Sequence, residues 1–247
     1  MIKYQKSTVL TDKKTHYCPG CTHGSIHKLV AEVIEELNIV GNTVGVASVG
    51  CSVYSYDYFQ FDMQQVPHGR ACANATGIKR VLPDRVVFTY QGDGDLASIG
   101  IAETIHAANR GENITVIFVN NAIYGMTGGQ MAPTTLEGQK TTTSQAGRNH
   151  LVQGNPIKIS EMFSQIDGVA YLERVTMTSP AAVRKAKAAI KKAFTYQMEK
   201  KGFTMVEILS TCPVNWGMTP VDAMEWIDST MTKTYKLGVF KDINAHD

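Results

Sequence analysis

Two short polar segments follow apolar runs in a spacing that could bind a metal-bound diphosphate. A Gly-Asp-Gly sequence at 92–94 follows the apolar run 86–90, and an Asn pair at 120–121 follows the apolar run 114–119. Both runs are rich in β-branched and aromatic residues, which predicts buried strands that end at the polar groups. A helix between two such strands makes them parallel, so both polar groups would lie at one edge of a sheet.

Each residue type in these segments has a chemical use at such an edge. The two glycines carry no Cβ, so the backbone could approach a phosphate, and the amides that begin a helix predicted at 96–110 would face the anion. Asp93 supplies a carboxylate, Asn121 an amide oxygen and Ile123 a main-chain carbonyl. With phosphate oxygens, these ligands would nearly complete the octahedral coordination that Mg²⁺ prefers.

The pattern resembles the diphosphate-binding motif of thiamine diphosphate enzymes, and its continuation NNAIYGMTGGQ resembles the version in 2-oxoacid:ferredoxin oxidoreductases. The alternative is a glycine turn and a polar strand end, as in many α/β proteins. The resemblance implies thiamine diphosphate and Mg²⁺ as cofactors. The residues expected to contact thiamine diphosphate are Val49, Gly50, Cys51, Ser52, His68, Gly92, Gly94, Asp95, Tyr124, Gly125, Met126 and Thr127.

The cysteines suggest a second cofactor. The chain has five cysteines, an odd number, and its N-terminus has no apolar run typical of a signal peptide. A disulfide framework is therefore not expected, and we expect the protein to lie in a reducing cytoplasm. Cys18 and Cys21 form a CPGC motif that leaves three alternatives: a redox pair, half of a zinc site, or half of an iron–sulfur site. The polar segment 11–16 is no convincing strand, which disfavours a thioredoxin-type pair.

A closed iron–sulfur or zinc site needs four ligands, so two more cysteines must come from elsewhere. The same family resemblance places the ligands of a [4Fe–4S] cluster at Cys18, Cys21, Cys51 and Cys212. The alternative is four ordinary buried cysteines. Cys72 has no counterpart that would be a ligand and is expected to be a small buried apolar residue.

The resemblance, which runs from CPGC to STCPVNWG, implies the β subunit of a heteromeric enzyme that oxidatively decarboxylates a 2-oxo acid to an acyl-coenzyme A. The cluster would pass electrons to ferredoxin. The 127–156 segment resembles 2-oxoisovalerate or 2-oxoglutarate enzymes, and Met126 stands where some members have asparagine. The rival hypotheses are a thiamine-dependent decarboxylase or synthase without electron transfer and a zinc-stabilised scaffold with a degenerate site.

The resemblance also assigns roles beyond the two cofactors. It implies a catalytic His68 near thiamine diphosphate, and Arg70 is expected to pair with a carboxylate or a phosphate. The glutamate that activates the cofactor comes from another domain in the family, so we expect an α subunit to supply it and the chain alone to be inactive. Partner γ and ferredoxin-like δ subunits are expected as well.

The elements that must position these residues read as one α/β domain over 1–247, with a mostly parallel sheet, helices on both faces, an N-terminal cluster-binding segment and a C-terminal helical tail. Predicted strands lie near 43–49, 85–91, 114–119, 170–175 and 203–210, and predicted helices near 24–38, 71–82, 96–110, 160–167 and 180–200. Segment 127–156 is predicted to be a lid or partner-facing loop, with a disordered excursion as the alternative.

Composition agrees with this class of protein. The chain is 43% hydrophobic with a formal net charge of +2, which indicates neither nucleic-acid binding nor a strongly charged surface. No apolar run approaches the length of a membrane-spanning helix.

Overall fold

The computed structural model describes residues 5–245, which form a seven-stranded sheet in the order β2-β1-β3-β4-β6-β5-β7. The strands are β1 (Thr43–Ala47), β2 (Asp62–Gln65), β3 (Val86–Gly92), β4 (Thr115–Asn120), β5 (Val169–Thr176), β6 (Phe203–Leu209) and β7 (Gly238–Asp242). All neighbouring strands are parallel except β7, which is antiparallel to β5. This confirms the predicted α/β class and its mostly parallel sheet.

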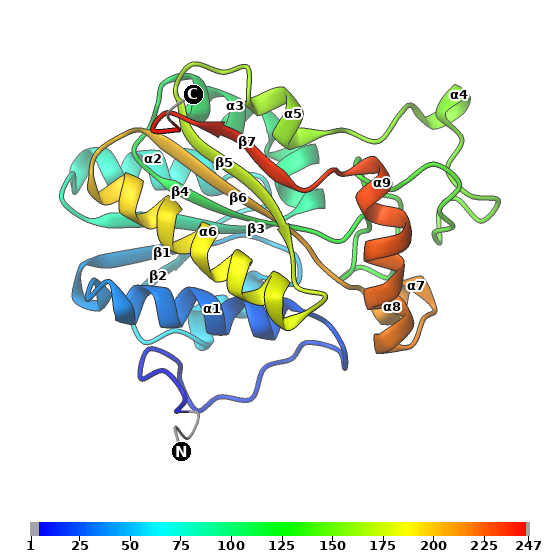
Figure 1. Ribbon diagram of the computed structural model, residues 1–247, viewed down its shortest axis with the longest axis horizontal. Helices are drawn as coiled ribbons and strands as arrows, with labels where there is room; N and C mark the ends of the chain where they lie inside the picture. Colours follow the sequence, from blue (N-terminus) through cyan, green and yellow to red (C-terminus); the bar gives the residue numbers. More distant parts are fainter. Residues whose placement is uncertain (1–4, 246–247) are drawn as a thin grey trace.

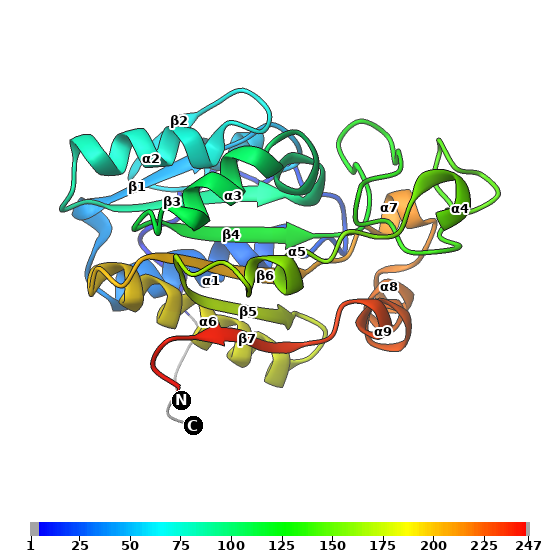
Figure 2. The ribbon, with the colours of Figure 1, turned by 90° about the horizontal axis from the view of Figure 1, so that it is seen from above.

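Helices cover both faces of the sheet (Figure 1). The helices are α1 (His23–Glu36), α2 (Ala71–Val81), α3 (Ile101–Asn109), α4 (His150–Gln153), α5 (Ile159–Phe163), α6 (Pro180–Met198), α7 (Pro213–Trp216), α8 (Pro220–Trp226) and α9 (Thr232–Thr234). Figure 2 shows α1 and α6 on one face and α2 and α3 on the other. Each face encloses its own apolar core, so the central strands are buried on both sides, which explains their continuous apolar sequences.

The five predicted strands are all present, and the sequence prediction missed β2 and β7. Both missed strands lie at the edges of the sheet, and β2 has the polar sequence DMQQ with a largely exposed burial pattern. An edge strand has a neighbouring strand on one side only and is open on the other side, so it can form without an apolar run. The predicted helical tail is helical only to Thr234, after which the chain returns to the sheet as β7.

Two predicted helices differ from the structure. The helix predicted at 160–167 ends at Phe163. The helix predicted at 96–110 is interrupted: a π-helical turn at Asp95–Ile99 is followed by Gly100, and α3 begins only at Ile101. At Gly100 the backbone that precedes α2 packs closely, because a Cβ there would lie 2.7 Å from the carbonyl oxygen of Gly69. The close approach of Gly69 leaves no room for a side chain at Gly100, just after the π-helical turn.

The carboxyl ends of β1, β3, β4 and β6 all reach the same edge of the sheet, where their loops meet α7 and the long 127–156 loop (Figure 2). Cys51, Asp93, Asn121 and Cys212 follow these strand ends. Within residues 5–245, no helix is both long enough and apolar enough to cross a membrane.

Candidate active site

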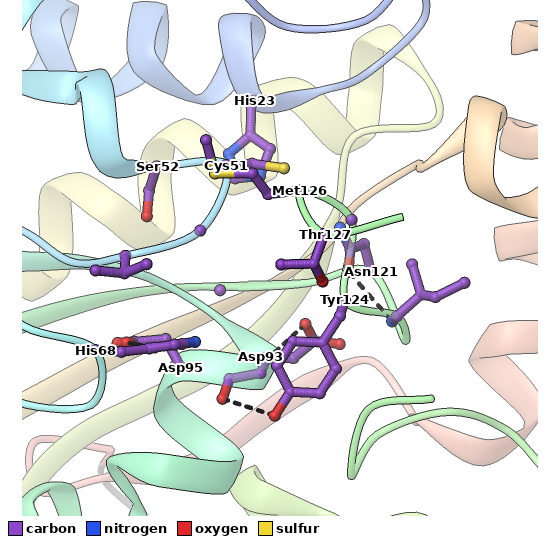
Figure 3. A pocket seen from close by; sticks show the side chains of 16 residues that line it. His23, Cys51, Ser52, His68, Asp93, Asp95, Asn121, Tyr124, Met126 and Thr127 are labelled. Carbon is purple, nitrogen blue, oxygen red and sulfur yellow. Dashed lines mark hydrogen bonds and ion pairs between the residues drawn. The ribbon is translucent and has the colours of Figure 1, made fainter. Parts of the chain in front are cut away.

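A cavity of about 90 Å³ opens at this edge, between the ends of β1, β3 and β4 (Figure 3). Every residue predicted to contact thiamine diphosphate or Mg²⁺ lines it, and His23 from the start of α1 is an addition. The structure thus brings together side chains that are spread from Val49 to Thr127 in the sequence. Their individual roles remain predictions.

Asp93 is a buried acid of this cavity. Its side chain is buried, its Oδ1 accepts a hydrogen bond from the Gly94 amide at 2.9 Å, and its Oδ2 accepts one from the Thr134 hydroxyl. No lysine or arginine within residues 5–245 forms an ion pair with it. Burial therefore raises the pKa of Asp93 to about 7. A buried carboxylate without a cationic partner is suited to a metal ion.

The two adjacent asparagines face different environments. Asn120 donates from Nδ2 to Glu207 at 2.8 Å and accepts from the Ala122 amide at 3.1 Å, so its side chain belongs to the protein interior. Asn121 lines the cavity, and its Oδ1 accepts weakly from the Ile123 amide at 3.3 Å. The left-handed conformation of Ala122, with φ of 56°, turns the chain sharply after this pair. Asn121 is therefore the asparagine that lines the cavity, and its role as a metal ligand stays a prediction.

The two glycines of the turn serve different purposes. A Cβ on Gly92 would meet no atom within 4 Å, so this backbone faces open space, as the phosphate hypothesis requires. A Cβ on Gly94 would lie 2.2 Å from Cε1 of Tyr124, whose hydroxyl donates to the Gly94 carbonyl at 3.2 Å. Gly94 is thus required by the packing of Tyr124, which the sequence prediction did not foresee.

This difference leads to a testable pair of substitutions. Gly94→Ala should lower the free energy of unfolding by about 1–3 kcal/mol, because overpacking must displace the Tyr124 ring. Gly92→Ala should leave stability nearly unchanged while weakening diphosphate binding. Urea denaturation of the ligand-free variants measures the first effect and calorimetry with thiamine diphosphate the second. Equal stability of the two variants would contradict the assignment for Gly94.

Asp95 lines the cavity, and its predicted contact with the cofactor stays a prediction. Protein donors already surround its carboxylate: Oδ1 accepts from Ser48 and from the Gly69 amide, each at 2.6 Å, and Oδ2 accepts from Gln91 at 2.6 Å. His68 also contacts Oδ1 through its Nδ1 atom. Asp95 therefore holds protein groups at the cavity wall, among them the predicted catalytic histidine.

A second cavity of about 200 Å³ adjoins the first. Cys18, Cys21, Cys51 and Cys212 all line it, although they come from three distant parts of the chain. The two cavities share His23, Cys51, Asn121, Gly125 and Met126 as lining residues, so they have a common wall. Figure 3 shows His23, Cys51 and Met126 together at this wall.

Gly125 lies where two of the sulfurs meet the first cavity. A Cβ on Gly125 would lie 3.2 Å from the Cys51 sulfur and 3.5 Å from the Cys212 sulfur, so its backbone packs against both. Burial raises the pKa of Cys51 to about 12 and that of Cys21 to about 11. These thiols would be neutral on their own, and a bound metal would be needed to hold them as thiolates.

Hydrogen bonds fix the CPGC segment to the end of β6. The Thr22 and Ser210 hydroxyls are 2.6 Å apart, and the Thr211 hydroxyl donates to the Gly20 carbonyl at 2.7 Å. On the other side, Asn215 donates from Nδ2 to the Cys212 sulfur at 3.3 Å and to the Gly125 carbonyl at 2.9 Å. These contacts hold cysteines nearly two hundred residues apart against one cavity.

Cys72 lies apart from this group. It is fully buried in the core beneath α2, and its sulfur contacts Gln91 Oε1 at 3.3 Å. This placement agrees with the prediction of a buried packing residue.

Arg70 forms an ion pair with Glu103. A carboxylate was one of the two partners predicted for Arg70.

The 127–156 loop is ordered around a buried arginine. Arg148 is 5% exposed and donates to the carbonyls of Ala132, Pro133, Thr135, Gln153, Gly154 and Asn155. The first part of the loop reaches the site through Thr127 and Thr134, whereas its far end carries α4 and projects from the domain (Figure 1). Leu151 and Val152 of α4 are 82% and 79% exposed, which fits a partner-facing loop better than a lid.

The sequence prediction missed some residues of the site. One of them is His23, and its position two residues after the CPGC motif was the available signal. Thr134 and Asn215 reach Asp93 and Cys212 only through folding of the loop and of α7, and no local pattern marks them.

Comparisons with known proteins agree with this geometry. Residues 40–208 match the family model described as "Thiamine pyrophosphate enzyme, C-terminal TPP binding domain". The ketoisovalerate oxidoreductase subunit VorA of Methanothermobacter thermautotrophicus is 47% identical over 231 residues, which are 94% of this chain and 48% of the relative. The chain therefore spans about half the length of this relative.

Two further relatives are matched over most of their length. The 2-oxoglutarate synthase subunit KorB of Methanocaldococcus jannaschii is 38% identical over 87% of this chain and 75% of its own. A solved structure of 2-oxoglutarate:ferredoxin oxidoreductase from Magnetococcus marinus, with 2-oxoglutarate, coenzyme A and succinyl-CoA bound, superposes with a TM-score of 0.78 at 26% identity, covering 100% of this chain and 87% of that one. The chain thus belongs to the thiamine pyrophosphate enzymes, in the family of the thiamine-pyrophosphate-binding subunits of 2-oxoacid oxidoreductases.

Proposed function

We propose that the chain is the β subunit of a 2-oxoacid:ferredoxin oxidoreductase, which converts a 2-oxo acid and coenzyme A to an acyl-coenzyme A, carbon dioxide and electrons for ferredoxin. One observation carries the proposal: the cavity lined by four cysteines shares a wall with the cavity expected to hold the diphosphate. A decarboxylase or synthase without electron transfer would have no use for this second cavity.

The first cavity suits a magnesium diphosphate. Asp93 offers a buried carboxylate with no protein cation beside it, and Asn121 offers an amide oxygen at the same edge. With the Ile123 carbonyl these are the hard oxygen ligands that Mg²⁺ prefers. The open space at Gly92 leaves room for the phosphate oxygens. When bound, thiamine diphosphate would supply the electron-rich carbon that decarboxylation requires.

The second cavity suits a [4Fe–4S] cluster held by Cys18, Cys21, Cys51 and Cys212. Thiolates are the usual ligands of such a cluster, and the alternative of a zinc scaffold would need them gathered within about 2.3 Å of one ion. The proposed reaction needs a group that accepts single electrons, which an iron–sulfur cluster can do and a zinc ion cannot, and this favours the cluster.

The shared wall defines what this chain contributes to electron transfer. Gly125 packs against the sulfurs of Cys51 and Cys212 and lines the cofactor cavity on its other side. Because Gly125 has no side chain, only its backbone separates the two cavities at this point. His23, which is buried, and Met126, which is 45% exposed, belong to the same shared wall, together with Asn121.

The proposal includes partners that complete the site. An α subunit would supply the carboxylate that activates the cofactor, and γ and ferredoxin-like δ subunits, ferredoxin and coenzyme A would complete the reaction. The exposed Leu151 and Val152 on α4 offer apolar surface for such an interface. Free cysteines that must bind a cluster indicate a reducing compartment, and we therefore place the enzyme in the cytoplasm.

We propose 2-oxoisovalerate as the substrate, with 2-oxoglutarate as the second candidate. Among the described residues that line the first cavity there is no lysine or arginine to pair with the second carboxylate of 2-oxoglutarate, whereas Val49, Ile123 and Met126 provide apolar surface. The relatives named for ketoisovalerate are 47% identical to this chain, against 38% for KorB of Methanocaldococcus jannaschii.

The test is an assay of the chain with and without its co-expressed partner subunits. The assembled complex should reduce a viologen dye in a reaction that depends on both 2-oxoisovalerate and coenzyme A, with a higher kcat/KM than for 2-oxoglutarate. The isolated chain should bind the cofactor but not turn over. Full turnover by the isolated chain would refute the divided site, and a preference for 2-oxoglutarate would overturn the substrate assignment.

A further inference from the structure

Asp95 is the centre of a buried hydrogen-bond network that ends at the cofactor cavity. The residue is 2% exposed, and its two oxygens receive donors from Ser48, Gly69 and Gln91. The Gln91 amide has a fixed orientation, because its Oε1 accepts from the Thr89 hydroxyl at 2.9 Å and from the Cys72 thiol at 3.3 Å. Its Nε2 donates to Asp95 Oδ2.

This arrangement determines how His68 meets Asp95. Gln91, Ser48 and the Gly69 amide all donate, so the Asp95 carboxylate acts towards them only as an acceptor. An acceptor of this kind places a proton on the facing ring nitrogen, which is Nδ1 of His68. The His68 side chain is 28% exposed and lines the cofactor cavity, and its Nε2 has no protein partner within residues 5–245.

We propose that Asp95 is a positioning residue that holds His68 as the Nδ1–H tautomer and so presents an unprotonated Nε2 to the cavity. Figure 3 shows the His68 ring beside Asp95, at the wall of the cavity. The exposed nitrogen is then a hydrogen-bond acceptor for an N–H or O–H group of the bound ligand. The identity of that ligand rests on the proposed function, whereas the tautomer does not.

The network explains two features that the diphosphate site leaves without a purpose. Gly69 has a φ of +78°, and a Cβ there would lie 2.7 Å from the Gly100 amide nitrogen. Only glycine therefore fits this turn, in which the Gly69 amide donates to Asp95. Cys72 lies behind Gln91 and orients the amide that in turn orients Asp95. Hydrogen bonds thus link the Cys72 thiol, on α2, through Gln91 and Asp95 to His68.

The experiment is nuclear magnetic resonance of the ligand-free chain with ¹⁵N-labelled histidine. Long-range ¹H–¹⁵N correlations at a pH of about 8, where an ordinary imidazole is neutral, report which ring nitrogen carries the proton. His68→Gln identifies the His68 signals among the seven histidines. We expect the Nδ1–H pattern in the wild-type chain. An Nε2–H pattern, or a ring protonated on both nitrogens, would overturn the proposal.

Two variants separate positioning from a general structural effect. Asp95→Ala should change the tautomer ratio by about tenfold or more, because a hydrogen bond to a charged group is lost. Asp95→Asn retains an acceptor oxygen and should restore the Nδ1–H form. If Asp95→Ala does not fold, the wild-type spectrum still decides the question. Ser48→Ala removes a donor to Asp95 without touching His68, so a changed tautomer in this variant would contradict the assignment.

The proposed function can fail separately from this inference. A wild-type chain that shows the Nδ1–H pattern but binds no thiamine diphosphate in calorimetry would overturn the cofactor assignment and leave the Asp95–His68 pair intact. Binding of thiamine diphosphate by a chain with the Nε2–H pattern would overturn the proposed role of Asp95 and leave the cofactor assignment intact.

Discussion

Asp93→Ala should abolish magnesium-dependent binding of thiamine diphosphate while the chain remains folded. The substitution removes a buried carboxylate that lines the described cavity together with Gly92 and Asn121. Loss of a residue that merely supports a metal ligand weakens metal binding 10- to 100-fold, so loss of the ligand itself should weaken cofactor binding by about a hundredfold or more. Calorimetry with thiamine diphosphate and Mg²⁺ measures this effect.

The asparagine pair provides a matched control for the same site. Asn121→Ala should also weaken cofactor binding, because its side chain lines the cavity. Asn120→Ala should instead reduce stability, because it leaves Glu207 without the amide donor at 2.8 Å. Thermal unfolding of both variants, beside the binding data, separates the two roles. Normal cofactor binding by Asp93→Ala would refute the metal assignment.

Alanine substitution of Cys18, Cys21, Cys51 or Cys212 should each remove most of the cluster iron and the visible absorbance that comes with it. A cuboidal cluster that lacks one thiolate is exposed to solvent on that side and becomes labile. Anaerobic reconstitution, followed by iron and sulfide analysis of each purified variant, measures this loss. Zinc in place of iron in the wild-type chain would support the scaffold hypothesis instead.

Cys72→Ala is the matched control, since it changes a cysteine outside the group. We expect full iron content and a loss of about 1 kcal/mol in the free energy of unfolding, from the removed sulfur and its contact with Gln91. Retention of iron by Cys212→Ala together with loss of iron by Cys72→Ala would show that the fourth ligand has been misassigned.

The central sheet and the ends of its strands could be predicted from the sequence because their signals are local. β3 and β4 are continuous apolar runs, and each ends where Gly92 or Asn120 begins the polar segment. Parallel strands joined by a helix bring their carboxyl ends to one edge wherever such a pattern occurs. The meeting of Asp93 with Asn121 therefore followed from the strand pattern alone. The edge strands β2 and β7 lacked such a signal, because a strand with one open side can be polar.

The sequence by itself determined the α/β class, the positions of the two cofactor motifs and the separation of Cys72 from the other cysteines. Tertiary structure decided how the motifs meet. Strand β6 pairs with β4 and β5, and the Thr22–Ser210 contact then holds the CPGC segment beside Cys212. Tertiary structure also placed Tyr124 against Gly94 and His68 against Asp95. These outcomes depend on contacts between residues far apart in the chain, whose energies no local window of sequence contains.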